Sequence, residues 1–69
     1  MKEISELLIR KSWKQDNLMS YSMVKNNNSF ELFFDTSNQV EMYLNGKRIA
    51  ECFFRDMKEL ENFIEKCVS

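Results

Sequence analysis

The only glycine of this 69-residue chain follows an asparagine, in a segment whose apolar and polar residues alternate on both sides of the pair. Asn45-Gly46 supplies the two positive-φ residues that a type I′ turn needs. The sequence therefore predicts a tight antiparallel hairpin over Val40–Ala50, with the second strand continuing to Phe53. Because Gly46 is committed to this turn, the chain has no glycine left for a phosphate-binding loop.

The alternation in the hairpin assigns its residues to two faces. A two-residue loop pairs Leu44 with Lys47 and Met42 with Ile49. The expected core-facing set is Val40, Met42, Leu44, Ile49 and Phe53, and the opposite set is Glu41, Tyr43, Arg48, Ala50 and Cys52. Glu51 is an exception, since the alternation places its carboxylate among apolar residues. Either it lies at the rim of the sheet, or a β-bulge turns it outward.

Four further segments complete the expected fold. Charge order and apolar spacing predict a helix over Lys2–Lys14, and alternation predicts strands over Asn17–Lys25 and Ser29–Asp35. The last helix, Met57–Cys67, carries one apolar stripe and follows Asp56, which is an N-cap residue with a glutamate three positions later.

These elements predict one α+β domain over residues 1–69, with the order α-β-β-β-β-α. Short connections favour a four-stranded antiparallel meander, and two flanking helices on one face would make a two-layer sandwich. The pattern leaves open which side of Asn17–Lys25 is buried, because Met19, Tyr21 and Met23 compete with Leu18 and Val24. We expect this strand to lie at a sheet edge.

The composition offers little for catalysis or cofactor binding. The chain has no histidine and no proline, and its cysteines, Cys52 and Cys67, are too far apart for a CxxC-type metal pair. We expect no enzyme activity, cofactor, metal or small-molecule substrate. The chain has neither a secretory h-region nor an apolar run long enough to cross a membrane, which favours a cytoplasmic protein with reduced thiols.

The large apolar residues favour a protein-interaction module. The chain has nine aromatic residues and five methionines, more than one helix-covered core needs. The expected partner-binding residues are Ile9, Trp13, Tyr21, Phe33, Tyr43 and Arg48. The module could act as a homodimer, a stoichiometric inhibitor or an adaptor, and its size and composition fit a bacterial or phage accessory gene. An alternative for Trp13 is that it folds under the helix end and caps the core.

The alternative function is nucleic-acid binding on the helix-free side of the sheet. Phe33 and Tyr43 could stack on bases while Arg48 contacts phosphate. The element order resembles the double-stranded-RNA-binding domain in topology alone. The basic cluster that starts the last helix of that family is replaced here by the mixed-charge segment Arg55–Glu59. A net charge of −1 predicts no strongly basic surface.

Overall fold

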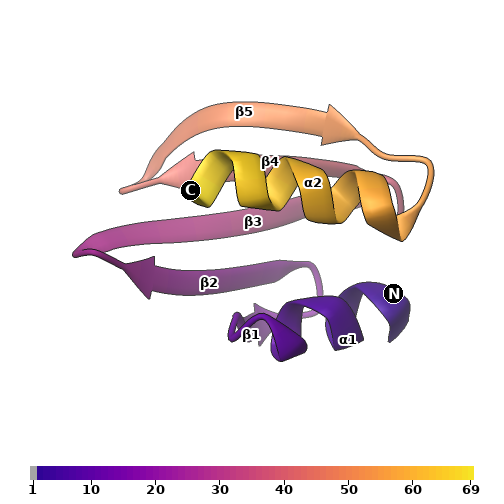
Figure 1. The fold of residues 1–69 in the computed structure, drawn as a ribbon, viewed down its shortest axis with the longest axis horizontal. Coiled ribbons are helices and arrows are strands. Elements are labelled where there is room, and N and C mark those ends of the chain that lie inside the picture. Colours follow the sequence, from indigo (N-terminus) through magenta and orange to yellow (C-terminus); the bar gives the residue numbers. More distant parts are fainter. Residues whose placement is uncertain (1) are drawn as a thin grey trace.

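The computed structural model describes residues 2–69 as an antiparallel sheet with two helices on one of its faces (Figure 1). In chain order the elements are α1 Lys2–Arg10, β1 Lys14–Asn17, β2 Ser20–Lys25, β3 Asn28–Thr36, β4 Gln39–Leu44, β5 Lys47–Phe53 and α2 Met57–Val68. The five strands lie side by side in sequence order, so the sheet is a simple meander. The predicted α+β fold is confirmed, with one more strand than expected.

The extra strand exists because α1 ends four residues earlier than predicted. Ser12 has a φ of 71°. The Trp13 N–H donates to Leu8 O at 2.9 Å and the Ser12 N–H donates to Ile9 O at 3.0 Å. This is the Schellman pattern of helix termination, in which the chain reverses and an apolar residue just past the end packs back on the last turn. Trp13 is accordingly 3% exposed and belongs to the core.

The four residues after Trp13 form a hairpin with β2. Lys14 pairs with Ser22 and Asn17 pairs with Ser20. The Asn17 side-chain oxygen accepts from the Met19 N–H at 3.0 Å, which closes the turn. β2 is therefore an interior strand, flanked by β1 and β3, and the expectation that Asn17–Lys25 forms one strand at the edge is wrong.

Two tight turns set the register of the central strands. Asn26 and Asn27 have φ values of 53° and 66°, and Asn45 and Gly46 have values of 51° and 86°. Both turns thus have the paired positive φ angles of type I′, as expected for Asn-Gly. The Asn45 side chain also accepts from the Ser29 N–H at 2.9 Å, which ties one turn to the start of β3.

The core fills the space between the helices and the facing side of the sheet. Its buried members are Ile4, Leu7, Leu8, Trp13, Tyr21, Phe30, Leu32, Phe34, Val40, Met42, Phe54, Leu60 and Ile64. The side of β2 that carries Tyr21 and Met23 faces this core, together with Met19 of the preceding turn, whereas Leu18 and Val24 are exposed. The Tyr21 and Phe34 rings meet edge to face at 5.9 Å. The structure thus shows that the Tyr21 side of β2 is the buried one, a choice that the sequence pattern did not decide.

A β-bulge in β5 changes the expected facing of its residues. Leu44 pairs with Lys47 as predicted, but Tyr43 pairs with Arg48 and Met42 pairs with Ala50, so Ile49 is the extra residue. Beyond the bulge the alternation is inverted. Ala50 and Cys52 pack on the core, while Ile49, Glu51 and Phe53 are exposed. The predicted core positions of Ile49 and Phe53 are therefore wrong, and the bulge alternative for Glu51 is correct.

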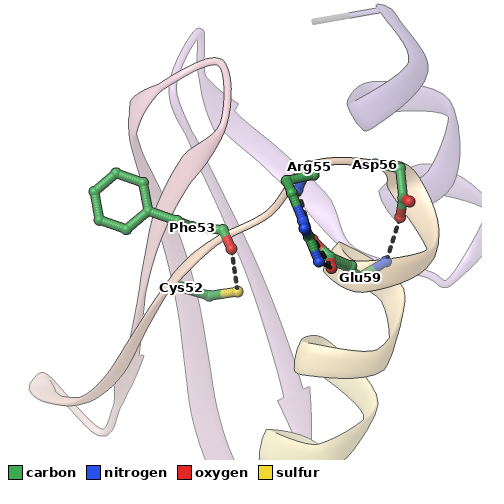
Figure 2. Close-up of polar contacts among 5 residues, drawn as sticks. All are labelled: Cys52, Phe53, Arg55, Asp56 and Glu59. Carbon is green, nitrogen blue, oxygen red and sulfur yellow. Dashed lines mark hydrogen bonds and ion pairs between the residues drawn. The ribbon is translucent and has the colours of Figure 1, made fainter.

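The start of α2 is fixed by side chains that the sequence singled out. The Asp56 carboxylate accepts from the Glu59 N–H at 2.9 Å, and Glu59 in turn accepts from the Arg55 N–H at 2.7 Å (Figure 2). These contacts satisfy two backbone donors near the helix N-terminus. Figure 2 also shows the Phe53 ring and the Cys52 thiol on opposite sides of β5, with the thiol on the α2 side.

Candidate functional site

The face of the sheet that carries no helix is the candidate site, and we call it the open face. Its side chains come from two cross-strand rows and the strand ends beside them. One row is Ser20, Phe33, Glu41 and Glu51, the next is Lys14, Ser22, Glu31, Tyr43 and Arg48, and Val24, Asp35, Ile49 and Phe53 lie around them. Phe33 and Ile49 are each 46% exposed and Phe53 is 70% exposed.

A shallow hollow of about 450 Å³ opens on this face. It is lined by Asn17, Ser20, Glu31, Leu32, Phe33, Glu41, Tyr43 and Gly46. The rings of Phe33 and Tyr43 give it apolar surface, and the carboxylates of Glu31 and Glu41 give it negative charge. The hollow is therefore amphipathic, with aromatic surface and acidic groups side by side.

Arg48 is held by the acidic groups of its own sheet. Its guanidinium lies 3.7 Å from Glu41 Oε1 and 3.8 Å from Glu51 Oε2. The Tyr43 hydroxyl donates to Glu41 Oε1 at 3.0 Å, and this hydrogen bond raises the pKa of Tyr43. One cation and one phenol thus orient the Glu41 carboxylate, whose side chain is only 16% exposed.

Asp35 and Glu41 are a pair of interacting carboxyl groups on the same face. The hydrogen bond between them raises the pKa of Asp35 and lowers the pKa of Glu41. Asp35 is therefore the member of the pair that keeps its proton to a higher pH. With Glu31 and Glu51 the pair makes four acidic groups on the open face, against the two bases Lys14 and Arg48.

The structure brings three of the six predicted site residues together. Phe33, Tyr43 and Arg48 share the open face, on adjacent strands. Ile9 is also exposed, at 55%, but it lies on α1.

The expected exposure of Trp13 and Tyr21 is wrong. They are 3% and 0% exposed. Trp13 is drawn into the core by the end of α1, as the capping alternative anticipated. Tyr21 is buried because the side of β2 that carries Tyr21 and Met23 faces the helices.

Sequence reasoning missed two of the most exposed apolar residues of this face, Ile49 and Phe53. Both were assigned to the core by unbroken alternation through β5. The carboxylate of Glu51 at an expected core position was the available signal, because a bulge that turns Glu51 outward also turns Phe53 outward, and here the extra residue of the bulge is Ile49.

The two cysteine thiols are not activated as nucleophiles. Burial raises the pKa of the Cys52 and Cys67 thiols, which disfavours the nucleophilic thiolate. Within residues 2–69 no group of three or more cysteine or acidic side chains is arranged to hold a metal ion. No helix in the same range has the length and apolar character to span a membrane.

Comparisons with protein-family models, with curated proteins and with solved structures find no match to this chain.

Proposed function

We propose that this chain is a non-catalytic protein-interaction module that binds a partner protein through its open face. The observation that carries the proposal is the set of large apolar side chains, Phe33, Ile49 and Phe53, left exposed on the face without helices. Exposed apolar surface rimmed by polar groups is typical of protein interfaces. Tyr43 and Arg48 are residue types enriched at the centres of such interfaces.

The charge of the open face indicates the kind of partner. Glu31, Asp35, Glu41 and Glu51 outnumber the two bases of this face, Arg48 and Lys14. A partner surface with apolar groups and exposed lysines or arginines complements this arrangement, because its cations reach carboxylates that the protein leaves in excess. As an inhibitor or an adaptor, the module would act by occupying such a surface.

Nucleic-acid binding is the weaker candidate for the same face. Phe33 and Tyr43 could stack on bases, but the phosphate contact expected of Arg48 competes with its pairing to Glu41 and Glu51. Phosphates would also approach the Asp35 and Glu41 carboxyl pair, and like charges oppose such binding.

Within this proposal the protein works in the cytoplasm. Both cysteines are free thiols in the structure, which fits a reducing compartment. The raised thiol pKa values support a packing role for them rather than a catalytic one.

The test is capture of partners by the tagged protein from a lysate of its source, with and without nuclease, at low and high salt. We expect a protein partner that resists nuclease and is lost in Phe33→Ser. Ile9→Ser is the matched control, since Ile9 is equally apolar and 55% exposed but lies on α1. Loss of the partner in Ile9→Ser alone would move the interface to α1. Captured material that disappears with nuclease would favour the nucleic-acid function.

A further inference from the structure

The two edges of the sheet differ in how they are protected. β1 is a four-residue strand in which every residue is exposed, its register is irregular, and it carries Lys14 and Asp16. Short length, charge and irregular pairing are the usual means of preventing strand addition. The β1 edge is therefore a poor template for another strand.

The β5 edge also carries charges and a bulge, but it differs from β1 in its length and in its exposed apolar side chains. β5 is seven residues long and pairs on one side only, with β4. It forms the outer margin of the sheet, with α2 lying over the sheet face rather than along this margin (Figure 1). Its bulge is at Ile49, the third of its seven residues, and Ala50–Phe53 keeps a regular ladder with β4. Half of the backbone N–H and C=O groups of an edge strand point away from its neighbour.

Three of the seven residues of β5 are charged, namely Lys47, Arg48 and Glu51. The Arg48 guanidinium lies 3.7 Å from Glu41 and 3.8 Å from Glu51, while the Arg48 and Glu51 side chains remain more than half exposed. Ile49 and Phe53 add exposed apolar side chains to the same strand. A long edge strand with exposed apolar side chains is expected to pair with a strand whose charges complement its own.

The order of residues along β5 makes the strand complementary to itself. Its first residues, Lys47 and Arg48, are basic, whereas Glu51 and Phe53 lie toward its other end. Antiparallel pairing of two such strands about Ala50 sets the basic end of each beside the acidic and aromatic end of the other. Parallel pairing would set like charges side by side, which is unfavourable.

We infer that β5 is a self-association edge, at which a second copy of this chain adds its own β5 in antiparallel orientation. The two sheets then form one continuous ten-stranded sheet about a two-fold axis near Ala50. Because such an axis runs perpendicular to the sheet, the open faces of both copies lie on the same side. Ile49 of each copy then lies beside the axis, and Phe53 of each copy lies along the same seam, near the basic end of the other strand. This inference does not depend on the identity of the open-face partner.

The experiment combines sedimentation equilibrium over a wide protein concentration range with amide hydrogen exchange. We expect a reversible dimer, and we expect amides in Ala50–Phe53 to gain protection as the dimer forms while those of β1 do not. Phe53→Lys places a third cation beside Lys47 and Arg48 of the second copy and should weaken dimerisation at least about tenfold. Val24→Lys is the matched control, since Val24 is 74% exposed on the same face but lies on β2.

Each other outcome would overturn the inference. A chain that stays monomeric at every concentration has no self-association edge. A dimer that is indifferent to Phe53→Lys and leaves the β5 amides unprotected is formed by another surface. Protection of β5 that appears only when a captured partner is added would assign the edge to a foreign strand instead of a second copy.

Discussion

The two faces of the same sheet show how one strand can serve both stability and recognition. On β3, Phe30, Leu32 and Phe34 are at most 6% exposed beneath the helices, whereas Phe33, between two of them, is 46% exposed on the open face. The two kinds of position alternate residue by residue. Substitutions on the helix-covered face should therefore alter folding, and substitutions on the open face should alter binding. Each prediction below tests that division.

Trp13→Ala should have the largest effect, because it removes the indole from beneath the end of α1. The Trp13 side chain is 3% exposed. Its backbone N–H, which the substitution keeps, donates to Leu8 O at the end of α1. Truncation of a buried aromatic of this size costs about 3–5 kcal/mol. Urea unfolding followed by circular dichroism measures the loss, and Trp13→Phe gives a milder variant if the alanine variant does not fold. An unchanged unfolding midpoint would show that Trp13 is not part of the core.

Leu60→Ala should be the next largest change. Leu60 is fully buried where α2 packs on the sheet. We expect a loss of about 2–5 kcal/mol in the free energy of unfolding, since the cavity is closed in by neighbours that cannot fully collapse. Glu65→Ala on the exposed side of α2 is the control and should cost far less. Equal effects of the two substitutions would contradict the assignment of the covered face.

Tyr21→Phe, also on the helix-covered face, should raise the free energy of unfolding instead of lowering it. The Tyr21 hydroxyl is buried and has no hydrogen-bond partner among residues 2–69, although the ring packs edge to face on Phe34. A buried hydroxyl without a partner costs about 1–3 kcal/mol, so its removal should stabilise the protein by about 1 kcal/mol. The unfolding midpoint in urea should rise without a change in slope. A fall in the midpoint would reveal a hydrogen bond that the hydroxyl makes in solution.

The residues that were predicted well are those with a strictly local cause. Asn45-Gly46 dictates its turn through backbone geometry alone, and Asp56 caps α2 through a hydrogen bond three residues away. The stripe of Leu60 and Ile64 likewise follows from helical periodicity. Such features need no knowledge of the rest of the chain.

The residues that were predicted poorly depend on the geometry of neighbouring elements. One extra residue at Ile49 inverts every later position in β5, which moved Phe53 from the expected core to the open face. The positive φ of Ser12 ended α1 early and created β1, although serine carries no strong signal for that conformation. The sequence thus predicted only part of the open face. Phe33, Tyr43 and Arg48 lie on regular alternation, whereas Ile49 and Phe53 lie beyond the bulge.

Phe53→Ser tests the open face directly and should leave stability almost unchanged. The Phe53 ring is 70% exposed, and exposed substitutions of this kind usually change the free energy of unfolding by no more than about 0.5 kcal/mol. The same variant should lose affinity for an open-face partner. A stability loss comparable to that of Leu60→Ala would show that the ring belongs to a core, and the division between the two faces would fail.

Asp35→Asn should give the smallest change in stability, and the size of this change depends on pH. The pKa of Asp35 in the folded protein is raised above its ordinary value, chiefly by its hydrogen bond to Glu41. Folding therefore disfavours the ionised form of Asp35. This penalty is absent below the ordinary pKa of an aspartate and is complete above the raised pKa of the folded state.

The asparagine variant supplies an amide N–H donor for Glu41 and removes that penalty. Its midpoint in urea should exceed that of the wild-type protein near neutral pH, and the two should converge as the pH falls below the ordinary aspartate range. An advantage for the variant that is the same at every pH would assign the effect to turn geometry rather than to charge. The opposite sign at neutral pH would mean that Asp35 is stabilised by a cation. Such a result would weaken the case for an open face with negative charge in excess, and with it the expectation of a basic partner.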